Sequence, residues 1–291
     1  MRRSQPVDGF QLGYDTSGDG PAILLLHGWP GDRTDYRRLV PLLAGSATVV
    51  VPDLRGFGGS DQHLVDPAAP IGASPYSADA QVRSVVGLIG ELGLDRPVIG
   101  GYDVGSRVAQ TLARSHPDLV RALVISPPVP GVGDRILGPQ AHREFWYQAF
   151  HQLDLVEDLV DGRPEAVRSY LRHFWTHWSG PDFTPTDEHL DHLVSGYSPP
   201  GAFVASIGWY RAGAAVVARA LAERPPAPDQ RIAVPTTILW PELDPLFPPQ
   251  WADRVDEYFG AARVQHLAGV GHFVPVEAPG PFAAALLAAI R

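Results

Sequence analysis

Three side chains that could together perform covalent hydrolysis each follow an apolar run along the chain. They are Asp103 in GYDVGS, Asp244 in WPELDP and His272 in GVGHFV. A carboxylate can attack carbon to form an ester, a histidine can activate the water that hydrolyses the ester, and a second carboxylate can orient the histidine. We therefore expect Asp103 to be the nucleophile, His272 the base and Asp244 the acid that holds it.

The residues on either side of Asp103 bear on whether it is only a helix cap. Aspartate is a favoured N-cap residue, so a purely structural role is possible. However, a strand, a small residue, an acid, a small residue and a helix form the pattern of a nucleophile elbow, which lifts the central side chain to the edge of the sheet. Gly101 and Gly105 are the small residues here. The chain order nucleophile, acid, histidine favours the chemical role.

A fourth segment, LLLHGWPGD, leaves the first strongly apolar run. A turn at the end of a strand can direct backbone N–H groups toward a reacting centre. We expect the N–H groups of Trp29 and Val104 to form an oxyanion hole beside Asp103. We assign His27 a structural role, bonded to the backbone.

The elements that must position these residues follow an alternating rhythm. Apolar, β-branched runs alternate with helical patterns, which predicts an α/β fold with a mostly parallel sheet flanked by helices. The alternation of strand and helix patterns stops after Ser126, and an aromatic-rich stretch with helical patterning follows it up to about residue 230. We interpret residues 1–127 and 231–291 as a core domain and residues 128–230 as an inserted helical cap. The expected strands are 22–26, 47–51, 97–100, 121–126, 236–240 and 262–267, and the expected helices are 35–44, 77–92 and 106–117.

The composition limits the partners of the 291-residue chain. Its net charge of −9, from 23 basic and 32 acidic residues, argues against nucleic acid or an anionic membrane as a partner. It has no cysteine, which excludes thiolate metal sites and fits the reducing cytoplasm. We see no signal-peptide pattern and no membrane-spanning apolar run. The glycine-rich GFGGS lacks a phosphate-binding fingerprint, so we expect no nucleotide cofactor. The histidine pairs 173/177 and 189/192 have no accompanying acid in a metalloprotease arrangement, so we expect no metal.

Five segments together resemble the α/β-hydrolase superfamily and, within it, the epoxide hydrolases, which are related to haloalkane and haloacetate dehalogenases. The segments are HGWP (27–30), VPDLRGFGGSD (51–61), GYDVGSRVA (101–109), WPELDPLFP (240–248) and GVGHFVPVEAP (269–279). The resemblance implies the α/β-hydrolase fold with a helical cap. It also implies that a small apolar epoxide is opened to a vicinal diol through an alkyl ester on Asp103, with water as the second reactant.

The resemblance further implies two cap tyrosines that donate to the opening epoxide oxygen. GWYRAG points to Tyr210 as one of them, and REFWYQAF places Trp146 at the other expected position, with Tyr147 adjacent. One residue along a helix is a rotation of about 100°, so Tyr147 serves only if the register shifts. Tyr170 and Tyr197 are further candidates.

Two other functions stay open. A carboxylate nucleophile also suits displacement of a halide, and Arg107 stands where fluoroacetate dehalogenases have one of two arginines that hold the substrate carboxylate. The other arginine of those enzymes would stand at the position of Val104. A non-catalytic ligand-binding protein with the same fold is the remaining alternative. In the enzyme we expect Trp146, Trp209 and Phe273 to contact the substrate.

Overall fold

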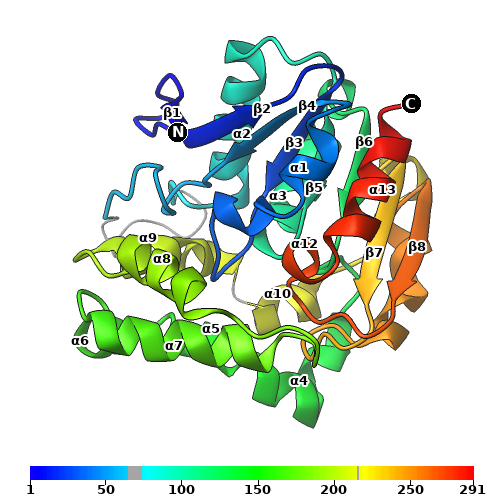
Figure 1. Cartoon of the computed structure of the whole chain (residues 1–291). Helices are drawn as coiled ribbons and strands as arrows, with labels where there is room; N and C mark the ends of the chain where they lie inside the picture. The colour runs from blue at the N-terminus through cyan, green and yellow to red at the C-terminus, as the bar shows by residue number, and fades with distance from the viewer. Residues whose placement is uncertain (65–73, 215) are drawn as a thin grey trace.

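The computed structural model describes residues 1–64, 74–214 and 216–291. Its centre is an eight-stranded sheet with the order β1-β2-β4-β3-β5-β6-β7-β8 (Figure 1). The first two strands pair antiparallel at one edge, and the other six run parallel. The strands are β1 (Arg2–Arg3), β2 (Gly13–Ser17), β3 (Ala22–Leu26), β4 (Thr48–Pro52), β5 (Val98–Gly101), β6 (Ala122–Ile125), β7 (Thr236–Pro241) and β8 (Ala262–Leu267).

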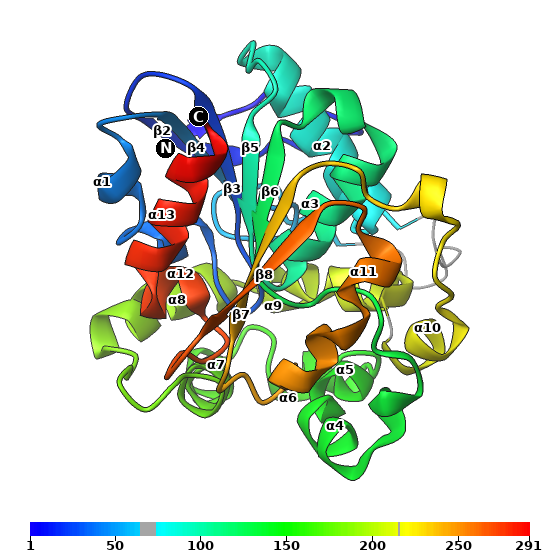
Figure 2. The same cartoon turned by 90° about the vertical axis from the view of Figure 1, so that its right-hand side faces the viewer.

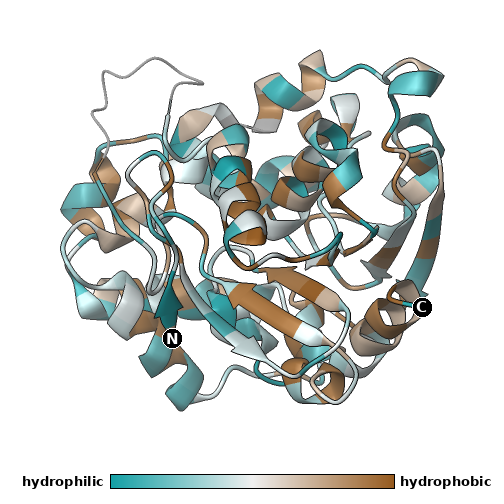
Figure 3. Cartoon of the chain, turned by 90° about the horizontal axis from the view of Figure 1, so that it is seen from above, coloured by the Kyte–Doolittle hydropathy of each residue, from teal (hydrophilic) through white to brown (hydrophobic). Residues whose placement is uncertain are grey.

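The central parallel strands are short apolar runs because helices cover both of their faces. Every residue of β5 and β6 is buried, and the strands at the centre of Figure 3 are largely hydrophobic. Helices α1 (Val40–Leu43) and α13 (Pro279–Ala289) lie on one face of the sheet. Helices α2 (Ala78–Glu91) and α3 (Val104–Ser115) lie on the other, as Figure 2 shows. Two short helices of the C-terminal half are α11 (Val255–Tyr258) and α12 (Val274–Glu277).

The chain between β6 and β7 holds helices and, among its described residues, no strand. Figure 1 shows α4 to α9 lying across the carboxyl ends of the parallel strands. Here we call residues 128–230 the helical insert; its limits as a domain stay a prediction. The insert contains η3 (Gly133–Leu137), α4 (Pro139–Glu144), α5 (Trp146–Phe150), α6 (Leu155–Leu159), α7 (Pro164–His177), α8 (Asp187–Tyr197), α9 (Ala202–Ser206), η4 (Tyr210–Ala214), α10 (Val216–Ala222) and η5 (Pro228–Gln230).

The predicted α/β class is confirmed, and all six predicted strands form. The helix predicted at 35–44 is wrong, because the chain there forms η1 (Arg33–Tyr36) and then α1. Asp32 caps η1, and Pro41 has no N–H to donate to the Arg37 carbonyl as a continuous helix would require, which explains the interruption. The patterns do not predict β2, since its GYDTS is short and mostly polar.

Among the described residues, no single helix combines the length and apolar composition needed to cross a membrane. Helix α8 and the stretch Ala202–Ala222 meet those criteria only when taken together, and they are bent by 97° relative to each other.

Candidate active site

Asp103 lies on a tight turn between β5 and α3 that only small neighbours permit. Its backbone φ angle is 49°, in the left-handed region that residues other than glycine rarely adopt. A Cβ atom on Gly105 would come within 1.9 Å of the Leu26 carbonyl oxygen, and one on Gly101 within 2.8 Å of the backbone of Gly105. The turn has the geometry of a nucleophile elbow, and this strained backbone holds the Asp103 side chain at the carboxyl end of the sheet.

The Asp103 carboxylate does not cap α3, although the residue occupies the N-cap position. Its Oδ1 atom accepts a hydrogen bond of 2.8 Å from the Trp29 N–H, and its Oδ2 atom lies 3.4 Å from Nε2 of His272. Among the hydrogen bonds of the described residues, none runs from the Val104 N–H to this carboxylate. The Trp29 half of the predicted oxyanion hole thus contacts Asp103 directly, and Val104 lines the pocket beside it.

His272 and Asp244 form a buried pair behind Asp103. The His272 Nδ1 atom lies 2.9 Å from Oδ2 of Asp244, and Oδ1 of Asp244 accepts from the Leu246 N–H at 2.8 Å. Burial disfavours the charged imidazole, but the carboxylates of Asp244 and Asp103 outweigh it and raise the pKa of His272 to about 10. The three side chains predicted to act together therefore form one connected row.

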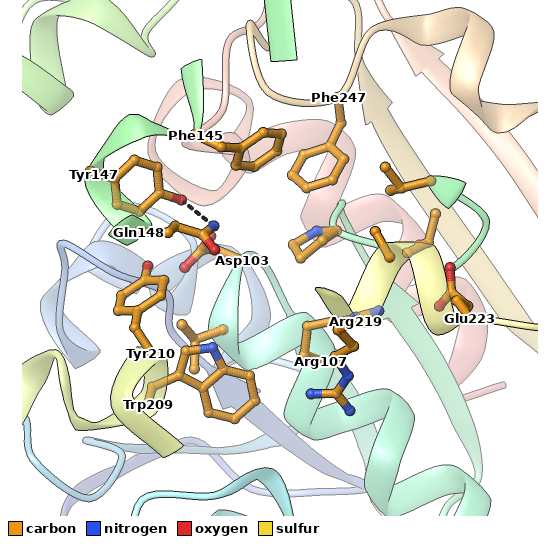
Figure 4. A pocket seen from close by; sticks show the side chains of 15 residues that line it. Asp103, Arg107, Phe145, Tyr147, Gln148, Trp209, Tyr210, Arg219, Glu223 and Phe247 are labelled. Carbon is orange, nitrogen blue, oxygen red and sulfur yellow. Dashed lines mark hydrogen bonds between the residues drawn. The ribbon is translucent and has the colours of Figure 1, made fainter. Parts of the chain in front are cut away.

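Two phenols of the helical insert face the Asp103 carboxylate. Tyr147 of α5 and Tyr210 of η4 line one pocket with Asp103, and their ring centroids are 5.6 Å apart. Figure 4 shows both side chains directed toward Asp103. Burial and the nearby Asp103 charge raise the pKa of both phenols, so each hydroxyl keeps its proton at neutral pH. Two proton donors and one carboxylate therefore converge on the same small space.

The structure shows which of the two neighbouring residues at the start of α5, Trp146 or Tyr147, faces Asp103. Tyr147 is 2% exposed and stacks on the Trp29 indole, with ring centroids 5.6 Å apart, whereas Trp146 is 43% exposed and packs on Phe174 outside the pocket. The phenol that faces Asp103 is therefore Tyr147. The place of Trp146 does not fit substrate contact, because its side chain is exposed and does not line the pocket that holds Asp103.

The other candidates divide between the pocket and the core. Trp209 lines the pocket, but Phe273 is fully buried against Trp175 at a ring distance of 3.7 Å and does not line it. The hydroxyl of Tyr197 donates to the Gly31 carbonyl, and that of Tyr170 pairs with a histidine ring. The Tyr197 hydroxyl therefore joins the insert to the core, and the Tyr170 hydroxyl bonds within the insert.

His27 has the structural place expected of it. Its Nδ1 atom lies 2.9 Å from the Gly28 carbonyl oxygen, and its Nε2 atom accepts from the Leu54 N–H at 2.9 Å. The ring therefore joins the turn that carries the Trp29 N–H to the strand end beside it.

Sequence reasoning missed several residues that line the pocket. Gln148 donates from its amide nitrogen to the Tyr147 hydroxyl at 3.1 Å, and Arg219 and Glu223 of the α10 region lie at the far wall. Phe145 and Phe247 supply apolar wall. Gln148 follows Tyr147 directly, which was the one available signal, whereas nothing in the local pattern marks Arg219.

Comparison with known proteins gives the family. A family model described as alpha/beta hydrolase fold matches residues 21–279. The soluble epoxide hydrolase of Corynebacterium sp. (strain C12) is 30% identical over 94% of this chain and 91% of its own. The fluoroacetate dehalogenase of Burkholderia sp. is 31% identical over 74% of this chain and 70% of its own.

The solved structure of the epoxide hydrolase CorEH without ligand has a similar fold. Its TM-score is 0.80 at 25% identity, with 99% of this chain and 97% of that chain covered. The family model spans most of the chain, and both relatives match across most of their own length. The chain belongs to the α/β-hydrolase fold family, in the group that includes epoxide hydrolases and their dehalogenase relatives.

Proposed function

We propose that this protein is an epoxide hydrolase that opens a small epoxide to a vicinal diol through an alkyl ester on Asp103. The observation that carries the proposal is the pair of buried phenols, Tyr147 and Tyr210, that face this carboxylate. An opening epoxide develops negative charge on an oxygen that stays in the product, so it needs proton donors at that oxygen. In this proposal residues 128–230 act as the cap that brings both donors.

In the first step a free Asp103 oxygen attacks one epoxide carbon and the carbon–oxygen bond of the ring breaks. The phenols of Tyr147 and Tyr210 donate to the departing oxygen, which remains attached to the neighbouring carbon. Asp103 is already held by the Trp29 N–H, so little reorganisation is needed before attack.

In the second step a water molecule attacks the carboxyl carbon of the ester. An alkyl ester carries no charge, so its formation removes one of the two carboxylates that raise the pKa of His272. The ring can then release its proton toward the alkoxide through the phenols and take one from water. The Trp29 N–H, with that of Val104, stabilises the oxyanion formed at the ester carbon. The tetrahedral intermediate then collapses: the bond from the carboxyl carbon to the diol oxygen breaks, this oxygen takes the proton from His272, and the Asp103 carboxylate is restored.

A haloacid dehalogenase is the second candidate, because Arg107 lines the Asp103 pocket and the Burkholderia relative is named a fluoroacetate dehalogenase. A halide leaves as a free anion and does not need two phenolic proton donors. The phenol pair therefore favours the epoxide.

Single-turnover hydrolysis of styrene oxide in heavy-oxygen water tests the proposal. The water oxygen should enter the Asp103 carboxylate and be absent from the diol, and His272→Gln should accumulate an enzyme heavier by one substrate mass. Heavy oxygen in the first diol would show direct attack by water. Brisk turnover of fluoroacetate or chloroacetate without turnover of the epoxide would favour the dehalogenase.

A further inference from the structure

A second cavity adjoins the pocket above Asp103. The Asp103 pocket has a volume of only about 80 Å³, whereas the neighbouring cavity has a volume of about 670 Å³. Arg107, Trp209, Arg219 and Glu223 line both spaces. A substrate with its reacting end at Asp103 therefore has room for the rest of its length in the second cavity, past these shared residues.

The second cavity carries a concentration of positive charge that is unusual for an acidic chain. Its lining includes four arginines against the single carboxylate of Glu223: Arg107, Arg114, Arg219 and Arg224. We call this space the arginine cavity. Within the described parts of the chain, none of the four has a carboxylate oxygen within 4.0 Å, and the Glu223 carboxylate accepts the Gly131 N–H at 2.7 Å. Most of this positive charge is therefore not neutralised by the protein.

Arg107 and Arg219 form the boundary between the two spaces (Figure 4). Arg107 comes from α3, one turn after Asp103, and Arg219 comes from α10 of the helical insert. Burial and the like charge of Arg219 lower the pKa of Arg107 to about 10, so its guanidinium stays charged at neutral pH. Arg107 and Arg219 repel each other, and the one carboxylate in the shared lining, that of Glu223, offsets only part of this repulsion. A bound anion would relieve the remainder.

We infer that the arginine cavity binds a carboxylate at the far end of an elongated epoxide substrate, with Arg107 and Arg219 as its principal partners. This inference rests on the proposed function of the Asp103 pocket and names its substrate class. Guanidinium groups match carboxylates in a planar, two-point geometry, so a pair of them selects a charged end over a neutral one. The apolar length between epoxide and carboxylate would pass Trp209, which lines both spaces.

Kinetics with paired substrates test the inference. We would compare terminal epoxides that carry a carboxylate at the end of an alkyl chain of increasing length with the carboxamide of each. One chain length should show at least a tenfold preference in kcat/KM for the acid. Arg107→Gln and Arg219→Gln should each lower the ratio of kcat/KM for that acid to kcat/KM for its amide by about tenfold, the factor for losing a charged hydrogen bond.

Arg263→Gln is the matched control, because this exposed arginine of β8 lies outside both spaces. It should leave both substrates unaffected. Equal kcat/KM for acid and amide at every chain length, or no selective effect of either cavity variant, would overturn the inference while the proposed hydrolysis stands.

A binding experiment separates failure of the inference from failure of the proposed function. Calorimetric titration with saturated alkanoates, which cannot react, should show binding that weakens in Arg219→Gln and at high salt, with no binding of the corresponding amides. If no epoxide is hydrolysed but the alkanoate binds in this way, the arginine cavity is supported and the hydrolase proposal is refuted. If epoxides are hydrolysed and the alkanoate does not bind, the cavity assignment is refuted.

Discussion

The charge state of His272 should make the stability of this protein fall with rising pH, and His272→Gln should remove that dependence. The pKa of His272 is raised from 6.5 to about 10 in the folded chain. A raised pKa means that the proton stabilises the folded state fully below about pH 6.5, and that this stabilisation is lost as the pH rises through about 10. Free energies of unfolding, from urea titrations at about pH 6 and about pH 9, measure the effect.

The two pKa values set its size. One pKa unit corresponds to 1.36 kcal/mol, so the linkage relation predicts that the wild type loses about 3 kcal/mol more than His272→Gln between about pH 6 and about pH 9. Lysines do not interfere with this measurement, because all 23 basic side chains of the chain are arginines. The N-terminal amine is common to both proteins, and its contribution cancels in the comparison.

Asp244→Asn provides a second variant that keeps the histidine. Burial alone lowers the pKa of an imidazole, so removing the carboxylate 2.9 Å from Nδ1 should lower the pKa of His272 and flatten the pH dependence of stability. Ring signals in an NMR titration would follow this pKa directly. Equal losses of stability in wild type and His272→Gln would refute the reasoning that the two carboxylates hold a charged imidazole between them.

Three further outcomes follow from the structure. Tyr147→Phe should lower kcat/KM for epoxides about 10- to 100-fold and leave the melting temperature unchanged; an unchanged rate would remove this phenol from the mechanism. Gly105→Ala should destabilise the chain by about 3 kcal/mol in urea unfolding, because its Cβ would meet the Leu26 carbonyl oxygen. Leu286→Ala, fully buried on α13, should cost about 2–5 kcal/mol, against about 0.5 kcal/mol or less for the exposed Leu137→Ala.

The core of the fold was predictable because its signals are local. Strands such as β3 and β6 lie between covering helices, so their whole length must be apolar, and a run such as ALVI shows this without knowledge of the neighbours. The Asp103 turn was predictable for a similar reason, since the small flanking residues that it requires all lie within the six residues 101–106. By contrast, β2 is a mostly polar edge strand that gains its place by pairing with β4.

The insert was less predictable because its geometry depends on breaks between helices. Helix α4 ends at Glu144 and α5 begins at Trp146, with Phe145 between them at φ −90° and ψ 11°. Rotation counted along one continuous helix does not carry across such a break, so the choice between Trp146 and Tyr147 could not be made from spacing. Arg219 reaches the pocket only through the packing of α10, for which the sequence offers no local sign.

Val104 separates this site from a clamp for a short haloacid, because the arginine that would pair with Arg107 in such a clamp is missing at position 104. Three residues along α3 correspond to a rise of about 4.5 Å, and both side chains line the Asp103 pocket. An arginine at position 104 would hold a carboxylate next to the carbon under attack, whereas Arg107 and Arg219 hold charge one helical turn farther on. The apolar side chain of Val104 suits a substrate whose reacting end is apolar. The cations of Arg107 and Arg219, which lie farther from Asp103, suit a substrate whose distal end is charged. Val104→Arg should therefore favour haloacids of two carbons at the expense of long epoxy acids. Competition between these substrates would measure the change in the ratio of their kcat/KM values.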